Sequence, residues 1–105
     1  MITITIVHDD NRKIVEFLVT GHADYKNKGD DIVCAAVSAV VQTAVEGLKR
    51  YLPEGIHLKK EKGILHLSIT KGANIYESSI ILETMLLGLK RIEENYQEYV
   101  RIVMP

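Results

Sequence analysis

The sequence contains the same succession of patterns twice. Two runs in which apolar residues recur at every second position are followed by one longer run in which they recur at every third or fourth position. A period of two places alternate side chains on one face of a strand, whereas the longer spacing places them on one face of a helix. The chain therefore predicts the order ββαββα, which is typical of a two-layer α+β domain with both helices on one face of a mainly antiparallel sheet.

In the first half, residues 2–7 and 14–20 form the two alternating runs, and Asp9, Asp10 and Asn11 supply turn residues between them. These runs predict an antiparallel hairpin in which Val15, Phe17 and Val19 share one face, with Ile14 on the other. A helix is expected from about Ile32 to about Tyr51, ended by Pro53 and Gly55. Its apolar residues at helical spacing are Val33, Val37, Val40, Ala44 and Leu48.

The second half repeats this outline. Residues 56–61 and 64–70 flank Lys62-Gly63, a two-residue connection suited to a hairpin, with Leu65, Leu67 and Ile69 on its inner face. Asn74 followed by Glu77 resembles a capping box, and a helix is expected to run to about Tyr96. Its apolar face should carry Ile81, Met85, Leu89, Ile92 and Tyr96. The tail from Tyr99 to Met104 alternates again and predicts a possible short C-terminal strand.

Length and composition limit the class of protein. A chain of 105 residues with 47% hydrophobic content is expected to form one domain over residues 1–105. Its formal charge of −1 provides no general basic field for nucleic acid. One cysteine excludes an intramolecular disulfide, and no secretory signal pattern is present, so we expect a cytoplasmic protein. The longest uncharged run, residues 32–45, is shorter than the ~20 residues that cross a membrane.

The segment from Gly21 to Ser38 carries the most unusual chemistry. If Asp31 caps the first helix, Cys34 lies in its first turn, where free backbone N–H groups and the helix dipole favour a thiolate. His22, 12 residues upstream, could fold back as the base that takes the thiol proton. The same N–H groups could then stabilise an oxyanion.

Helical spacing places Asp31 and Ser38 on the same face as Cys34. Asp31 could orient His22 or simply cap the helix, and Asp24 is a weaker rival for the orienting role. Ser38 could bind substrate or be a tolerated small polar residue. From the residues alone, the more common interpretation of such a cysteine is a small buried apolar residue rather than a nucleophile.

A metal site is disfavoured by the same residues. Cys34 with the scattered His57 and His66 lacks the ligand spacing of a zinc site, and both histidines fall on the polar positions of their strands. We expect no metal and no cofactor.

The contiguous blocks Gly21-His22-Ala23-Asp24-Tyr25 and Asp31-Ile32-Val33-Cys34-Ala35-Ala36-Val37-Ser38-Ala39, with Gly29 between them, resemble the signature of the ribosomal-processing cysteine protease family, Prp. The resemblance extends over nearly the whole chain, including Leu82 to Leu86. It implies Cys34 as nucleophile, His22 as general base, and Asp31 and Ser38 as supporting residues. It also implies a homodimer and a mobile substrate lid formed by Tyr25, Lys26, Asn27, Lys28 and Gly29.

The activity that this resemblance implies is that of a cytoplasmic cysteine endopeptidase. Its substrate would be the N-terminal extension of large-subunit ribosomal protein twenty-seven. The chain departs from the commonest family pattern at Lys26, Asn27 and Lys28, which concerns substrate fit more than reaction type. The alternative is a noncatalytic ribosome-associated binding module, although the near-neutral charge makes direct RNA binding less expected.

Overall fold

Seven elements of regular structure follow one another in the computed structural model, which describes residues 1–21, 28–70 and 72–105 and, at residues 28–31, the backbone alone. The elements are β1 (Ile2–His8), β2 (Ile14–Thr20), α1 (Lys28–Tyr51), β3 (Ile56–Glu61), β4 (Ile64–Ile69), α2 (Ile75–Asn95) and β5 (Val100–Val103). The predicted ββαββα order is confirmed, and the possible C-terminal strand is present as β5.

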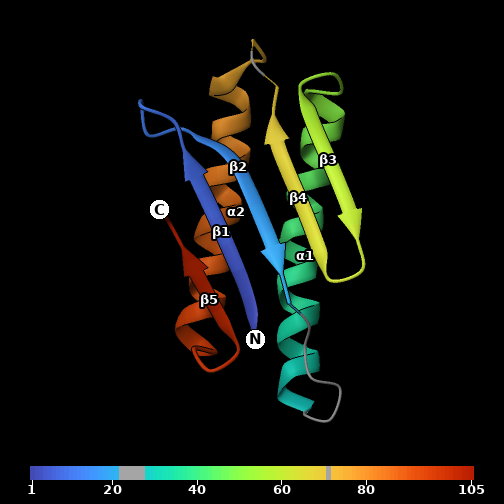
Figure 1. Ribbon diagram of the computed structural model, residues 1–105, viewed down its shortest axis with the longest axis vertical. Helices are drawn as coiled ribbons and strands as arrows, with labels where there is room; N and C mark the ends of the chain where they lie inside the picture. The colour runs from blue at the N-terminus through green and yellow to red at the C-terminus, as the bar shows by residue number, and fades with distance from the viewer. Residues whose placement is uncertain (22–27, 71) are drawn as a thin grey trace.

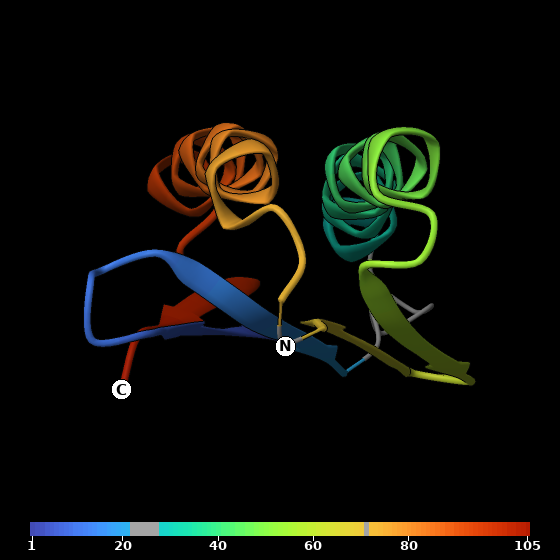
Figure 2. The ribbon, with the colours of Figure 1, turned by 90° about the horizontal axis from the view of Figure 1, so that it is seen from above.

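The strands form one five-stranded sheet in the order β3-β4-β2-β1-β5 (Figure 1). β1 pairs with β2, β2 with β4, and β3 with β4 in antiparallel fashion, whereas β5 lies parallel to β1. Both helices lie on one side of this sheet, as Figure 2 shows. The prediction of a two-layer α+β fold with a mainly antiparallel sheet is therefore confirmed, and the hydrophobic core lies between the two layers.

The β1–β2 hairpin differs from the prediction next to its turn. Ile6 faces Phe17 and Val7 faces Glu16, but His8 then faces Ile14. Val15 of β2 therefore has no opposite residue on β1. This irregularity is a β-bulge, which shifts the alternation by one residue. Ile14 is consequently fully buried, whereas Val15 is only partly buried. The prediction that Val15 shares the face of Phe17, with Ile14 on the other face, was wrong for these two residues.

The β3–β4 hairpin matches the prediction closely. Lys62 and Gly63 connect the strands, and Gly63 has a φ of 78°, a conformation in which glycine is favoured. Leu65 and Leu67 are buried and Ile69 packs against the core, as expected for the inner face of β4.

Helix α1 begins four residues earlier than predicted, at Lys28 rather than Ile32, and ends at Tyr51 as predicted. Its buried residues are Val33, Val37, Val41, Ala44, Val45 and Leu48. By length and hydropathy alone, Ile32–Tyr51 is apolar enough to cross a membrane. The apolar stripe of this helix packs against the sheet, however, so it serves as a core helix here.

Helix α2 begins as the sequence indicates. The side chain of Asn74 accepts a 3.3 Å hydrogen bond from the backbone N–H of Glu77, which is the N-cap half of the expected capping box. The buried stripe is Leu82, Met85, Leu86 and Leu89, with Ile81 and Ile92 partly buried beside it. Tyr96 does not continue this stripe: it is the C-cap residue and is 39% exposed.

Candidate active site

A cavity of about 190 Å³ lies between α1 and the turn end of the β3–β4 hairpin. Cys34 lines this cavity, and its half-buried side chain also packs against the hydrophobic core. Figure 1 shows that the start of α1, the end of β2 and the β3–β4 turn lie toward the same end of the molecule. Three segments that are distant in the sequence therefore meet around the one cysteine of the chain.

One face of α1 forms a wall of this cavity. Cys34, Ser38 and Gln42 all line it, and their spacing of four residues places them on successive turns of the helix. Val37 and Val41, beside them on the same helix, are buried. The structure thus brings Ser38 into the cavity of Cys34, where Ser38 is exposed to solvent.

The end of β2 forms the opposite corner of the cavity. Gly21 lines it with a φ of 99°, and its backbone N–H donates a 3.2 Å hydrogen bond to the carbonyl oxygen of Gly63 in the β3–β4 turn. A Cβ at position 21 would lie 2.1 Å from the carbonyl oxygen of Met1. Both the φ and this close approach require glycine at this position, because a side chain would clash with the backbone.

Several predicted site residues cannot be placed. His22, Asp24, Tyr25, Lys26 and Asn27 lie outside the described residues. Asp31 belongs to the helical backbone of α1, and its side chain is outside the described part of the chain.

The earlier start of α1 corrects two details of the predicted site. Asp31 is not the residue before the helix, and Cys34 is its seventh residue, in the second turn rather than the first. The dipole effect of a helix end is concentrated in its first turn, so the proposed activation of Cys34 by first-turn N–H groups does not follow from this geometry. Lys28 and Gly29, placed in the lid by the resemblance, belong to the backbone of α1.

Three polar residues in the cavity wall were not singled out from the sequence: Gln42 on α1, and Lys60 and Glu61 on β3. The sequence could have indicated Lys60, because this residue follows Ile56 and Leu58 at alternate positions and therefore falls on the apolar face of its strand. The sequence indicates Gln42 less strongly, through its position eight residues after Cys34 on the same helix face.

The histidines of the described residues lie away from this cavity. His66 forms a close contact with Glu16, which faces Ser68 on the neighbouring strand, and His57 is exposed. Within residues 1–21, 28–70 and 72–105, no group of three or more histidine, cysteine, aspartate or glutamate side chains is arranged to hold a metal ion.

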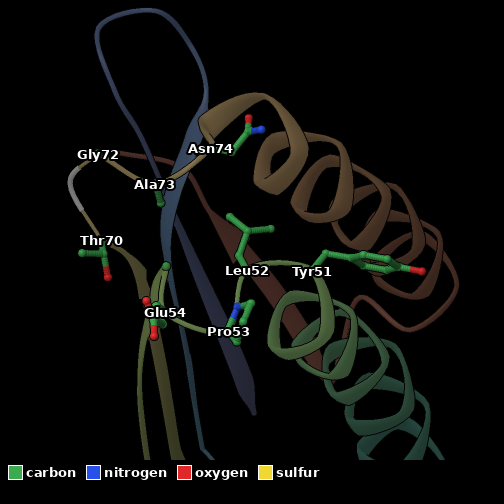
Figure 3. A pocket seen from close by; sticks show the side chains of 9 residues that line it. Tyr51, Leu52, Pro53, Glu54, Thr70, Gly72, Ala73 and Asn74 are labelled. Atoms are coloured by element: carbon green, nitrogen blue, oxygen red, sulfur yellow. The ribbon is translucent and has the colours of Figure 1, made fainter.

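Among the other hollows in the described part of the chain, two border α1. One, of about 450 Å³, is formed by the C-terminal end of α1 and the segment before α2, where Tyr51, Pro53, Thr70 and Asn74 surround it (Figure 3). The other, of about 570 Å³, is an apolar groove between α1 and α2. Tyr51 follows Cys34 by 17 residues, which corresponds to about 26 Å along the helix, so the first hollow is remote from the thiol.

The family model for cysteine protease Prp matches residues 1–101 of this chain. The chain belongs to this family. A ribosomal processing cysteine protease Prp from Staphylococcus aureus (strain Mu50 / ATCC 700699) is 38% identical in an alignment 105 residues long. The alignment covers 97% of this chain and 97% of the relative. Both the family and this relative are cysteine proteases, and so is the protein described here.

Crystal structures of the essential ribosomal processing protease Prp from S. aureus have the same fold. The complex with a substrate peptide matches with a TM-score of 0.89 and 34% identity, covering all of both chains. The complex with a covalently linked product peptide matches with a TM-score of 0.88 at the same identity and coverage. The agreement extends over the whole chain, so the relationship covers the complete ββαββαβ arrangement.

Proposed function

We propose that this cysteine protease removes the N-terminal extension of large-subunit ribosomal protein twenty-seven in the cytoplasm, with Cys34 as nucleophile and His22 as general base. The observation that carries the proposal is the position of Cys34. A cysteine protease needs a thiol that substrate can reach, and the single cysteine of this chain lines a cavity open to the surface.

The reaction would proceed by acyl transfer. His22 takes the proton of the Cys34 thiol, and the thiolate attacks the carbonyl carbon of the scissile peptide bond. As the C–N bond breaks, His22 returns that proton to the leaving amine, and the acyl group remains on Cys34 as a thioester. His22 then takes a proton from water as the water oxygen attacks the thioester carbon. The C–S bond breaks, His22 returns that proton to the Cys34 thiolate, and the carboxylic acid product leaves.

The placement of Gly21 supports the pairing of His22 with Cys34. Gly21 immediately precedes His22 in the chain and lines the same cavity as Cys34. Asp31 is assigned the role of orienting His22, with Asp24 as its rival. Ser38, exposed in the cavity one turn after Cys34, is assigned a hydrogen bond to the substrate.

The relatives support the proposed substrate class. The S. aureus protein is a ribosomal processing protease, and its structures hold substrate and product peptides. For the present chain, the remaining lid residues, Tyr25, Lys26 and Asn27, would close over the bound peptide. The two lysines at positions 26 and 28 would favour a polar or acidic stretch of substrate beside the scissile bond.

A peptide that spans the precursor's cleavage site, incubated with purified protein, tests the proposal directly. Cys34→Ala should abolish cleavage, and His22→Ala should reduce kcat by about 10²- to 10⁴-fold. Arg50→Ala provides a control on α1, because Arg50 is exposed and lines neither the Cys34 cavity nor the groove between α1 and α2. Cleavage that survives Cys34→Ala contradicts the assigned nucleophile. Binding of the precursor with no product over time supports the alternative of a noncatalytic binding module.

We also propose that the protein is a homodimer, with the apolar groove between α1 and α2 at the interface. Small residues line this groove, including Ala39, Gly47 and Gly88, and Ile80 at its edge is 50% exposed. Ile80→Asp should convert a dimer into a monomer in analytical ultracentrifugation. Leu87→Asp is the matched control, because Leu87 lies on the same helix and is 65% exposed but does not line the groove. An Ile80→Asp protein that remains dimeric excludes this surface.

A further inference from the structure

The sheet has two edge strands, and they differ in how they are protected. β3 and β5 lie at the two ends of the strand order β3-β4-β2-β1-β5, so one side of each has no neighbouring strand (Figure 1). Backbone N–H and C=O groups on such a side can pair with a strand of another molecule. A protein that keeps a separate sheet needs a feature at each edge that prevents this pairing.

The β3 edge is open but charged. Thr70 donates a 2.8 Å hydrogen bond to the carbonyl oxygen of Gly55, which lies one residue before β3 and opposite Thr70. Because bonded and non-bonded pairs alternate along antiparallel strands, Ile56, Leu58 and Lys60 direct their backbone N–H groups away from β4. No described residue accepts a hydrogen bond from these three groups. β3 ends in two exposed lysines and an exposed glutamate, and such charges oppose pairing with another strand.

The β5 edge has much less charge and a stronger preference for strand structure. Residues 99–104, Tyr-Val-Arg-Ile-Val-Met, are aromatic, β-branched or apolar except for Arg101. A segment of about six residues with high β-propensity, low charge and no proline is typical of strands that pair between molecules. Charge alone therefore protects β5 less well than β3.

The pairing of β5 with β1 determines which N–H groups face its free side. Ile2 lies opposite Val100, and its N–H donates a 2.8 Å hydrogen bond to the carbonyl oxygen of Tyr99. In a parallel pair, such a residue bonds to the two neighbours of its opposite residue and not to that residue itself. Val100 and Ile102 therefore direct their N–H groups away from β1, toward the free side.

Both of these N–H groups already have an acceptor from the end of α2. The N–H of Val100 donates to the carbonyl oxygen of Tyr96 at 3.1 Å, within the turn that joins α2 to β5. The N–H of Ile102 donates to the side-chain carboxylate of Glu93 at 2.6 Å. Glu93 is partly buried in the last turn of α2, which lies beside β5 in Figure 1. A side chain nine residues away thus fills a position that a neighbouring strand would otherwise occupy.

We propose that Glu93 keeps the edge of β5 closed to a second copy of this chain. With Ile102 bonded to Glu93, a strand placed against β5 finds no free N–H donor on that side. Without the carboxylate, the N–H of Ile102 is available, and β5 of one copy can pair with β5 of another to join their sheets. The inference is independent of the proposed nucleophile and of the groove between α1 and α2. An alternative role for Glu93 is repulsion between copies through its negative charge.

Sedimentation velocity of the intact protein at increasing concentration tests the proposal. Glu93→Leu should form species larger than the wild-type assembly, and their share should rise with concentration. In a dilute sample of this variant, the Ile102 amide should exchange its hydrogen about 5- to 150-fold faster, as expected when a partly buried N–H loses its acceptor. Glu93→Ala replaces the leucine variant if circular dichroism shows that leucine disturbs the fold.

Glu93→Gln separates the hydrogen bond from the charge. The glutamine amide oxygen still accepts from Ile102, whereas the negative charge is lost. This variant should keep the wild-type assembly. Larger species in Glu93→Gln, as abundant as in Glu93→Leu, would assign the protection to charge and overturn the inference.

Ile102→Pro, added to Glu93→Leu, separates edge pairing from a general loss of stability. Proline removes the N–H itself and is tolerated at edge positions whose N–H faces away from the sheet. The double variant is no more stable than Glu93→Leu, yet it should return to the wild-type assembly. Glu94→Leu, at the exposed neighbouring position, is the matched control and should also keep that assembly. A folded Glu93→Leu protein without larger species, or larger species that persist in the double variant, overturns the inference.

Discussion

The backbone N–H of Gly21 donates a hydrogen bond of 3.2 Å to the carbonyl oxygen of Gly63. Both residues have positive φ, 99° and 78° respectively, and both line the cavity that contains Cys34. The bond joins the end of β2 to the β3–β4 turn at the point where the chain continues toward His22. The backbone that leads to His22, the proposed general base, is thus held to the tight turn of the β3–β4 hairpin.

Gly21→Ala should destabilise the protein more than a change of φ alone would. The added Cβ would lie 2.1 Å from the carbonyl oxygen of Met1, so the N-terminal strand or the end of β2 must move. The strained φ costs about 1–2 kcal/mol and the steric overlap about 1–3 kcal/mol more. Urea unfolding followed by circular dichroism measures the loss.

Gly72→Ala separates these two contributions. Gly72 has a similar φ of 91°, but a Cβ there has no heavy atom within 4 Å. This variant should lose only the backbone contribution, about 1–2 kcal/mol. Equal losses in the two variants would show that the contact with Met1 has no energetic weight.

Ile14→Ala should be far more destabilising than Val15→Ala. The bulge in β2 buries Ile14 completely and leaves Val15 partly exposed. Replacing a fully buried isoleucine with alanine lowers the free energy of unfolding by about 2–5 kcal/mol. The same replacement of the partly exposed valine should lower it by less than about 1.5 kcal/mol. Chemical denaturation compares them, and the reverse ranking would show that the regular alternation is correct.

Asn74→Ala should reduce stability by about 1 kcal/mol, because the first turn of α2 loses the side-chain acceptor of the Glu77 N–H. Asn74→Ser should retain most of this stability, since serine is also a good N-cap residue. Thermal unfolding of the two variants gives the comparison. A serine variant as unstable as the alanine variant would mean that Asn74 acts through some other contact.

Glu93→Leu should weaken the attachment of β5. The carboxylate of Glu93 accepts a 2.6 Å hydrogen bond from the backbone N–H of Ile102, which links α2 to the edge strand. Leaving that partly buried N–H without its partner should cost about 1–3 kcal/mol. Hydrogen exchange at Ile102 should become faster. Glu94→Leu, at the exposed neighbouring position, should leave exchange there unchanged.

Local patterns were sufficient for most of the fold. Alternation identified β1, β3 and β4, the Lys62-Gly63 pair located one turn, and Asn74 located the start of α2, because each signal depends on residues close together in the chain. The bulge at Val15 could not be read in this way. Every second residue in β2 is compatible with either face, so the choice between Ile14 and Val15 depends on how β1 pairs with β2.

The sequence pattern also did not predict the correct first residue of α1. Asp30 and Asp31 are good N-cap residues, yet the helix begins at Lys28, since capping preference is worth only about 1 kcal/mol and other contributions can exceed it. This shift moved Cys34 from the first turn to the second. The first-turn N–H groups therefore no longer explain a thiolate at Cys34, although Cys34 remains the proposed nucleophile.

By itself the sequence determined the fold class, the order of the elements and the family signature around Cys34, because these depend on local spacing and on contiguous residues. Only the tertiary structure decided what surrounds the thiol. Gly21, Gln42 and Lys60 belong to three separate segments, and no local pattern relates them. They meet because β2 and the β3–β4 hairpin pair in one sheet beneath α1, and such long-range pairing is set by the packing of the whole core.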